Sequence, residues 1–162
     1  MTATPLTGGC QCGAVRFRAA SLGRASICHC RMCQKAFGSF FGPLVTAHGL
    51  VWTRGEPACF RSSNKVRRGF CAACGTPLTY EPDGFDAVEI AIGAFDDPAA
   101  IRPAIQLGTE SRVPWFHELA DLPGRPPGNA AAIEAFFAGL VSFQHPDHDT
   151  ASPPAPTGEK EP

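Results

Sequence analysis

The sequence predicts a mainly β domain with a few short helices and one longer helix near the C-terminus. Turn formers are frequent, with 17 glycines and 16 prolines among 162 residues, and this excludes a long helical bundle. Apolar residues make up 44% of the chain, enough for a core, and the 18% of charged residues is too low for a disordered chain. The length fits a single domain.

Short apolar runs between turn residues predict the strands. Residues 15–18 alternate apolar and basic side chains, which is typical of a half-buried strand. Gly42-Pro43 interrupts the following run, so residues 40–45 are expected to form a bent or edge strand. A turn signal separates residues 50–53 from 58–61, and this predicts a hairpin. Residues 88–92 alternate cleanly and predict a further strand.

Three helical segments are expected. Residues 30–37 can form two turns that end at Gly38, and Pro98 can open a single turn over residues 98–101. The clearest helix covers residues 130–143, where apolar side chains recur at helical spacing and are expected to pack against the body. The predicted organisation is therefore a loose N-terminal segment, one domain and a disordered proline-rich tail, over residues 1–8, 9–143 and 144–162.

Charge and terminal composition limit the partners. The N-terminus has no basic and apolar signal pattern, and the longest apolar stretch is too short to span a membrane. A net charge of −1 gives no attraction to nucleic acid or to anionic lipid. We therefore expect a soluble cytoplasmic protein without nucleic-acid or membrane partners, and the oligomeric state stays open. In a reducing cytoplasm, eight cysteines indicate metal binding or catalysis more than disulfides.

The cysteines fall into spaced groups. Cys10-x-Cys12 and Cys71-x-x-Cys74 are pairs that each grip a metal ion from a tight turn, and together they supply the four ligands of a closed tetrahedral zinc site. Cys28-x-Cys30-x-x-Cys33 supplies three ligands and leaves a fourth position open, as in a catalytic zinc site. All-sulfur ligation suits zinc and rejects magnesium or calcium.

Spacing alone leaves alternatives open. The isolated Cys59 can complete the three-cysteine group, which would give two closed structural sites and no catalysis. The pairs can also be shuffled, with Cys10 and Cys12 joining two cysteines of the triple. For Cys59 itself, a small buried strand residue is the favoured interpretation.

The cysteine motifs and their flanking residues resemble a known family. The matching segments are Gly9-Cys10-x-Cys12-Gly13-x-Val15-x-Phe17, Cys28-His29-Cys30-x-x-Cys33-Gln34-Lys35 and Phe70-Cys71-x-x-Cys74-Gly75-Thr76-Pro77-Leu78. On these residues the chain is similar to the glutathione-dependent formaldehyde-activating enzyme and centromere protein V family, from about Gly9 to Pro123.

The resemblance implies a fold, a ligand set and an activity. The fold would be a β-tent of small antiparallel sheets around a structural zinc. Cys10, Cys12, Cys71 and Cys74 would hold that structural zinc, and Cys28, Cys30 and Cys33 would hold a second, catalytic zinc. The implied activity is that of a carbon–sulfur lyase that joins formaldehyde and glutathione as S-hydroxymethylglutathione.

The hypothesis that follows is a zinc-dependent lyase acting on a thiol adduct of a small aldehyde. A thiol such as glutathione would take the open zinc position and attack the aldehyde carbon. Arg31, Lys35, Arg67 and Arg68 are candidates for holding the anionic thiol, although each can equally be a solvated surface charge. His29 can face the site as a proton shuttle or be exposed. The alternatives are a non-catalytic zinc scaffold that binds a protein, and a redox or metal sensor.

Overall fold

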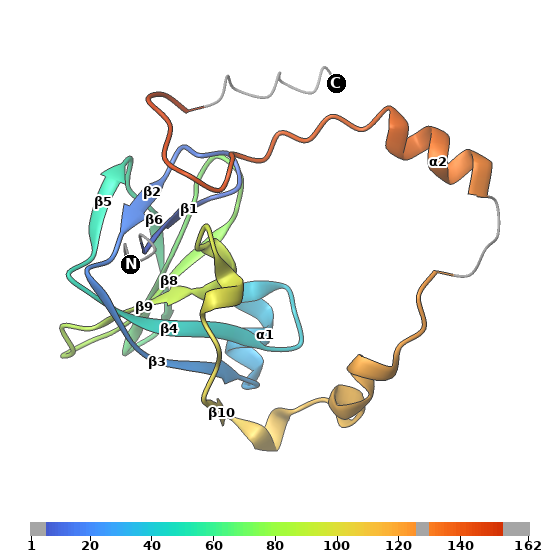
Figure 1. The fold of residues 1–162 in the computed structure, drawn as a ribbon. Coiled ribbons are helices and arrows are strands. Elements are labelled where there is room, and N and C mark those ends of the chain that lie inside the picture. Colours follow the sequence, from blue (N-terminus) through green and yellow to red (C-terminus); the bar gives the residue numbers. More distant parts are fainter. Residues whose placement is uncertain (1–5, 126–129, 154–162) are drawn as a thin grey trace.

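Two β-sheets organise the chain (Figure 1). The computed structural model describes residues 6–125 and 130–153. The smaller sheet has the strand order β1-β2-β5, with β1 (Thr7–Gly9), β2 (Arg16–Arg18) and β5 (Val51–Arg54). The larger sheet has the order β10-β3-β4-β9-β8-β7-β6. Its strands are β3 (Ser21–Cys28), β4 (Gly42–His48), β6 (Ala58–Ser63), β7 (Val66–Phe70), β8 (Pro77–Pro82), β9 (Val88–Ala91) and β10 (Ile105–Leu107). The predicted mainly β class is confirmed.

The helices are short. The α-helices are α1 (Arg31–Phe37) and α2 (Ala130–Ala138), and the 3₁₀ turns are η1 (Ile92–Ala94), η2 (Pro98–Ala100), η3 (Thr109–Ser111) and η4 (Pro114–Asp121). Helix α1 ends as the sequence predicts, because Gly38 adopts a left-handed conformation with φ 59° and its N–H bonds back to the last turn. Pro98 opens η2 at the predicted single turn.

The core lies between the two sheets. Phe17 of β2 is fully buried, and its ring meets the ring of Trp52 edge-on at 5.9 Å and that of Phe95 at 5.0 Å. Cys10 and Cys71 belong to the same buried cluster, with 3% and 1% of their surface exposed. The cysteine-bearing turns are therefore built into the core.

The predicted hairpin is wrong, and so is the edge position, one of the two alternatives for residues 40–45. Residues 50–53 and 58–61 do not form a hairpin, because β5 pairs with β2 in the smaller sheet and β6 pairs with β7 in the larger one. The long-range pairing of Trp52 with Phe17 outweighs the local turn signal. Strand β4 is internal, between β3 and β9. Pro43 is tolerated there because it pairs with β3 alone, and the pairing with β9 begins one residue later.

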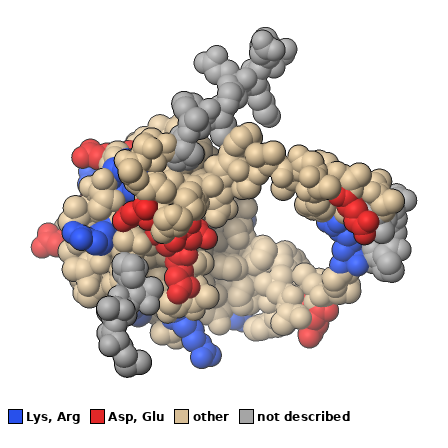
Figure 2. Space-filling view, turned by 45° about the horizontal axis from the view of Figure 1, so that its top comes forward, with Lys and Arg blue, Asp and Glu red and all other residues tan. Residues whose placement is uncertain are grey.

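The described residues 122–125 and 130–143 stand away from the sheets as an arm (Figures 1 and 2), whereas Phe116 of η4 still packs against His29. Helix α2 lies in this arm and ends at Ala138, before the predicted end at residue 143. Phe136 and Phe137 are 65% and 51% exposed, so the expected packing of the helix against the body is wrong. Helical spacing shows which side chains share a face, but it does not say whether another element covers that face.

Described residues near both ends of the chain contact the sheets or belong to them. The division into segments 1–8, 9–143 and 144–162 stays a prediction, and residues 1–5 and 154–162 lie outside the described residues. Thr7 and Gly8 belong to β1. In the predicted tail, His145 is 3% exposed, and its N–H donates to the carbonyl of Gln11 at 2.7 Å. None of the helices that the structure describes is both long enough and apolar enough to cross a membrane.

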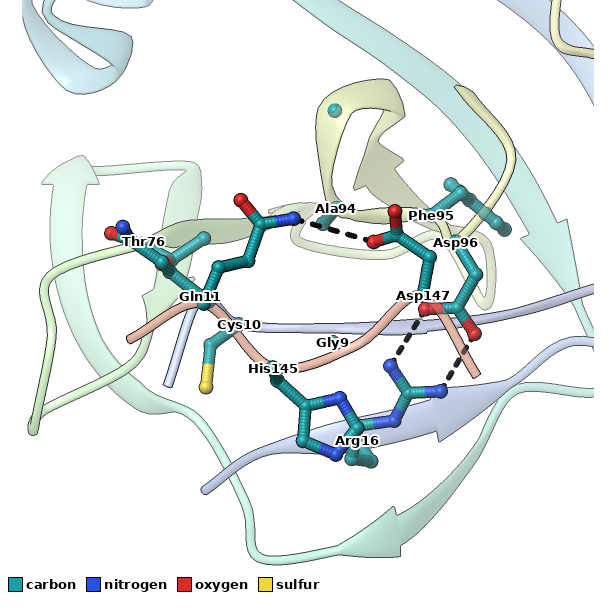
Figure 3. Close-up of a pocket in the computed structure, with 12 residues that line it drawn as sticks. Gly9, Cys10, Gln11, Arg16, Thr76, Ala94, Phe95, Asp96, His145 and Asp147 are labelled. Carbon is teal, nitrogen blue, oxygen red and sulfur yellow. Dashed lines mark hydrogen bonds and ion pairs between the residues drawn. The ribbon is translucent and has the colours of Figure 1, made fainter. Parts of the chain in front are cut away.

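A buried arginine joins β2 to both of these ends. Arg16 donates two hydrogen bonds to Asp96, at 2.7 and 2.6 Å (Figure 3). It donates further bonds to Asp149. Thr7 donates to the same Asp96 carboxylate at 2.6 Å. Burial tends to raise the pKa of Asp96, but the bonds from Arg16 and Thr7 outweigh it and hold that pKa below its usual value. The alternation at residues 15–18 predicts the strand, but it does not predict that Arg16 is buried.

We predict that Asp96→Ala lowers the free energy of unfolding by about 3 kcal/mol, because it leaves the Arg16 guanidinium buried with only a half-exposed partner. Asp149→Ala is the matched control and should cost less than about 1 kcal/mol, since solvent screens that pair. Urea unfolding of the metal-loaded proteins measures both values. Equal losses in the two variants would contradict this account.

Candidate metal centres

Four cysteines from two distant turns meet at one point. Cys10 and Cys12 lie on the turn between β1 and β2, and Cys71 and Cys74 lie on the turn between β7 and β8. All four Sγ atoms lie within 4.8 Å of one another. The Cys10 and Cys12 sulfurs are 3.6 Å apart, and those of Cys12 and Cys71 are 3.8 Å apart. This four-cysteine cluster can hold a metal ion.

Glycines shape both of these turns. Gly13 and Gly75 have φ angles of 73° and 78°, a left-handed conformation that favours glycine. The N–H of Gly13 donates to the Cys10 carbonyl at 3.0 Å, and the N–H of Gly75 donates to the Cys71 carbonyl at 2.8 Å. These tight turns bring the two sulfurs of each pair together. The N–H of Val15 then donates to the Cys10 sulfur at 3.2 Å, which favours its thiolate form.

The thiols of the four-cysteine cluster differ in acidity. Burial raises the pKa of Cys10, Cys12 and Cys71 above the usual 9.0. Burial acts in the same direction on Cys74, but hydrogen bonds from the Thr76 hydroxyl and backbone outweigh it and lower that pKa to about 6. A metal that binds here displaces protons from the thiols whose pKa is raised.

Three more cysteines meet beside α1. Cys28 ends β3, Cys30 caps the N-terminus of α1, and Cys33 lies in the first turns of that helix. Their Sγ atoms lie within 4.8 Å of one another, and Cys33 is 2% exposed. Burial and the neighbouring cysteines raise the pKa of Cys28 to about 12. For Cys30, hydrogen bonds from the backbone of α1 and from the neighbouring thiols outweigh burial and lower the pKa. This three-cysteine cluster can hold a second metal ion.

A buried arginine contacts the three-cysteine cluster. Arg68 of β7 is 3% exposed, and its Nη2 donates to the Cys33 sulfur at 3.3 Å. Its Nε donates to the Ser62 hydroxyl at 3.1 Å, and its guanidinium lies 4.9 Å from the centre of the Tyr80 ring. Because these contacts fix the guanidinium, its positive charge stays beside a sulfur whose thiolate form is negative.

The other basic candidates lie elsewhere. Arg67 points to the opposite side of β7 and is exposed, where it pairs with Glu81 at 2.5 Å. Arg31 and Lys35 are exposed on the outer side of α1, and they line an open hollow together with Phe60 and Arg61 of β6. Arg31 and Lys35 are therefore close in the chain to Cys30 and Cys33 of the three-cysteine cluster, because all four residues belong to α1 or to its N-cap.

The structure limits the alternatives for His29 and Cys59. His29 is fully buried, with its Nε2 at 2.9 Å from the Gln106 amide oxygen and its ring edge-on to Phe116 at 4.7 Å. Of the two alternatives for His29, the exposed side chain is therefore excluded. Cys59 is exposed on the edge strand β6, and it belongs to neither cluster among the described residues. The favoured interpretation of Cys59 as a buried strand residue is wrong because its strand has a neighbour on one side only.

Comparison with known proteins identifies a family profile. Residues 5–111 match the profile described as glutathione-dependent formaldehyde-activating enzyme, and this range contains all eight cysteines. Among solved structures, a Rhodobacter sphaeroides protein from a structural-genomics programme is 18% identical, covers 62% of this chain and 99% of its own, and has a TM-score of 0.49. The search of curated proteins gives no match.

We predict that the purified protein binds two metal ions per chain and that Cys28→Ser, which removes a ligand from the three-cysteine cluster, reduces this number to one. Cys10→Ser removes a ligand from the cluster inside the core, and we expect it to lose both ions together with the fold. Cys59→Ser is the control and should keep both ions, since Cys59 lies outside the clusters. Elemental analysis of the dialysed proteins gives the stoichiometry. A loss of metal in the Cys59 variant would contradict the assignment of ligands.

Proposed function

The chain belongs to the glutathione-dependent formaldehyde-activating enzyme family, and from this membership we propose that it is a zinc-dependent carbon–sulfur lyase. It forms or cleaves the thiol adduct of a small aldehyde, as in the joining of glutathione and formaldehyde. In the forward direction the thiol sulfur bonds to the carbonyl carbon, and the thiol proton ends on the carbonyl oxygen. The observation that carries the proposal is the three-cysteine cluster, which has one ligand fewer than a closed tetrahedral site.

Zinc is the metal that fits these donors. Four sulfurs at about 2.3 Å from a tetrahedral zinc lie about 3.8 Å from one another, and the Cys10–Cys12 and Cys12–Cys71 sulfur separations of 3.6 and 3.8 Å agree with this value. We assign a structural zinc to the four-cysteine cluster and a catalytic zinc to Cys28, Cys30 and Cys33. A zinc ion with an open position acts as a Lewis acid and lowers the pKa of a thiol that reaches it.

The residues around the three-cysteine cluster supply charge and orientation. Arg68 holds the Cys33 sulfur through its hydrogen bond and offsets the negative charge of the thiolates. Arg31 and Lys35 lie one turn apart on the exposed side of α1, next to the ligands Cys30 and Cys33. Their charges attract the carboxylates of glutathione and hold its thiol near the cluster.

The position of Cys59 favours an enzyme over a non-catalytic zinc scaffold. The scaffold alternative needs a fourth protein ligand at the second metal, and Cys59 was its candidate. This thiol is exposed on β6, and its contact is the Pro57 carbonyl at 4.0 Å. We also propose a cytoplasmic location, because a reducing compartment preserves the eight free thiols that the structure contains.

We predict that the zinc-loaded protein accelerates the exchange between glutathione and its formaldehyde adduct, and that Arg68→Met slows this exchange roughly 10–100-fold. The matched control is Arg67→Met, the neighbouring arginine on the exposed side of the strand, which should retain the full rate. NMR exchange spectroscopy measures the rate in both directions. No acceleration by the unmodified protein would contradict the proposed activity, and equal losses in the two variants would contradict the role of Arg68.

A further inference from the structure

A cavity of about 220 Å³ lies between α1 and the β6–β7 pair. Its walls include Ala36, Phe37, Phe60, Arg68, Phe70 and Pro77. The rings of Phe60 and Phe70 lie 6.1 Å apart at an angle of 60°, and they form one aromatic side of the cavity. Of these six wall residues, Arg68 alone carries a charge, so the cavity suits an apolar group.

The cavity adjoins the three-cysteine cluster. Arg68 is common to both, because it lines the cavity and donates to the Cys33 sulfur at 3.3 Å. Phe37 lies one helical turn beyond Cys33 on α1. The open hollow that contains Arg31 and Lys35 shares Ala36 and Phe60 with the cavity. A basic hollow that can bind an anion and a cavity that can bind an apolar group are therefore adjacent along the same helix.

The size of the cavity exceeds the needs of formaldehyde. An apolar cavity of about 150 Å³ in another protein binds benzene, and the volume here is about 220 Å³. The carbonyl carbon of formaldehyde carries two hydrogen atoms, which would leave such a space without contacts. An aromatic ring or a branched alkyl group would fill it and bury apolar surface.

We propose that this cavity binds the carbon substituent of the aldehyde, and that this substituent is an aromatic or branched alkyl group. The inference rests on the proposed lyase function and names its substrate class. Arg31 and Lys35 bind the anionic thiol part of the adduct, while the Phe60 and Phe70 rings bind the aldehyde part. The preferred substrates are then adducts of larger aldehydes, with formaldehyde as a poor one.

Calorimetric titration of the zinc-loaded protein tests this preference without turnover. S-benzylglutathione should bind at least about tenfold more tightly than S-methylglutathione, because its ring is buried. Ala36→Phe should abolish the difference by filling the cavity, while Ala132→Phe, on the exposed side of α2, should retain it. Phe60→Ala alters a half-exposed residue that the fold tolerates, and it should reduce the difference even if Ala36→Phe fails to fold.

A second titration separates the cavity from the proposed function. Benzyl alcohol carries the ring and an oxygen but no thiol part, and it should shift the backbone NMR signals of Ala36, Gly69 and Phe70. If benzyl alcohol shifts these signals while neither glutathione conjugate binds, the proposal that the cavity binds an apolar group is supported, and the proposal that glutathione is the thiol substrate is wrong. Equal affinities of the two conjugates, or no shifts with benzyl alcohol, would overturn the cavity proposal.

Discussion

The four-cysteine cluster is the contact on which the two sheets depend. One pair lies on the turn of the three-stranded sheet and the other on a turn of the seven-stranded sheet, with Cys12 and Cys71 separated by 59 positions in the chain. Phe17 of the smaller sheet is buried in the same cluster as Leu78 and Ile90 of the larger one, so the core needs both sheets in place. With Cys10 and Cys71 inside the core, a shared metal would fix the angle between the sheets and the position of every buried residue between them.

Two buried arginines show how this fold uses charge. Arg16 meets the Asp96 carboxylate, and Arg68 meets the Cys33 sulfur. A buried guanidinium requires an anionic partner, so the second contact is stable only when Cys33 carries negative charge. Arg16 donates its hydrogen bonds to the carboxylates of Asp96 and Asp149. Nη1 of Arg68, by contrast, has no hydrogen-bond partner in the described structure. The first arginine therefore joins distant segments of the chain, and the second holds a sulfur of the three-cysteine cluster.

The sequence predicts what local geometry determines. The closeness of the thiols within each motif follows from spacing, because two thiols on one tight turn must lie close together, and Gly38 marks the end of α1 for a similar local reason. Spacing leaves open which motifs share a metal, and the meeting of Cys10 and Cys12 with Cys71 and Cys74 depends on the fold. The partner of β5, the exposure of α2 and the choice between Arg67 and Arg68 depend on contacts between distant segments. Thr76 and Tyr80 were missed as site residues. Only the position of Thr76, two residues after Cys74, gave a sequence signal, since hydroxyl groups beside a ligand turn often donate to the sulfur.

The central claim is that seven cysteines divide into a closed set of four and an open set of three. X-ray absorption at the zinc edge measures this directly by counting the sulfurs around the metal. For the fully loaded protein we expect an average of 3.5 sulfurs per zinc, because seven ligands are shared between two ions. Addition of glutathione should raise that average to four as its sulfur completes the open site. An average of four sulfurs before any thiol is added, with no change afterwards, would contradict the account.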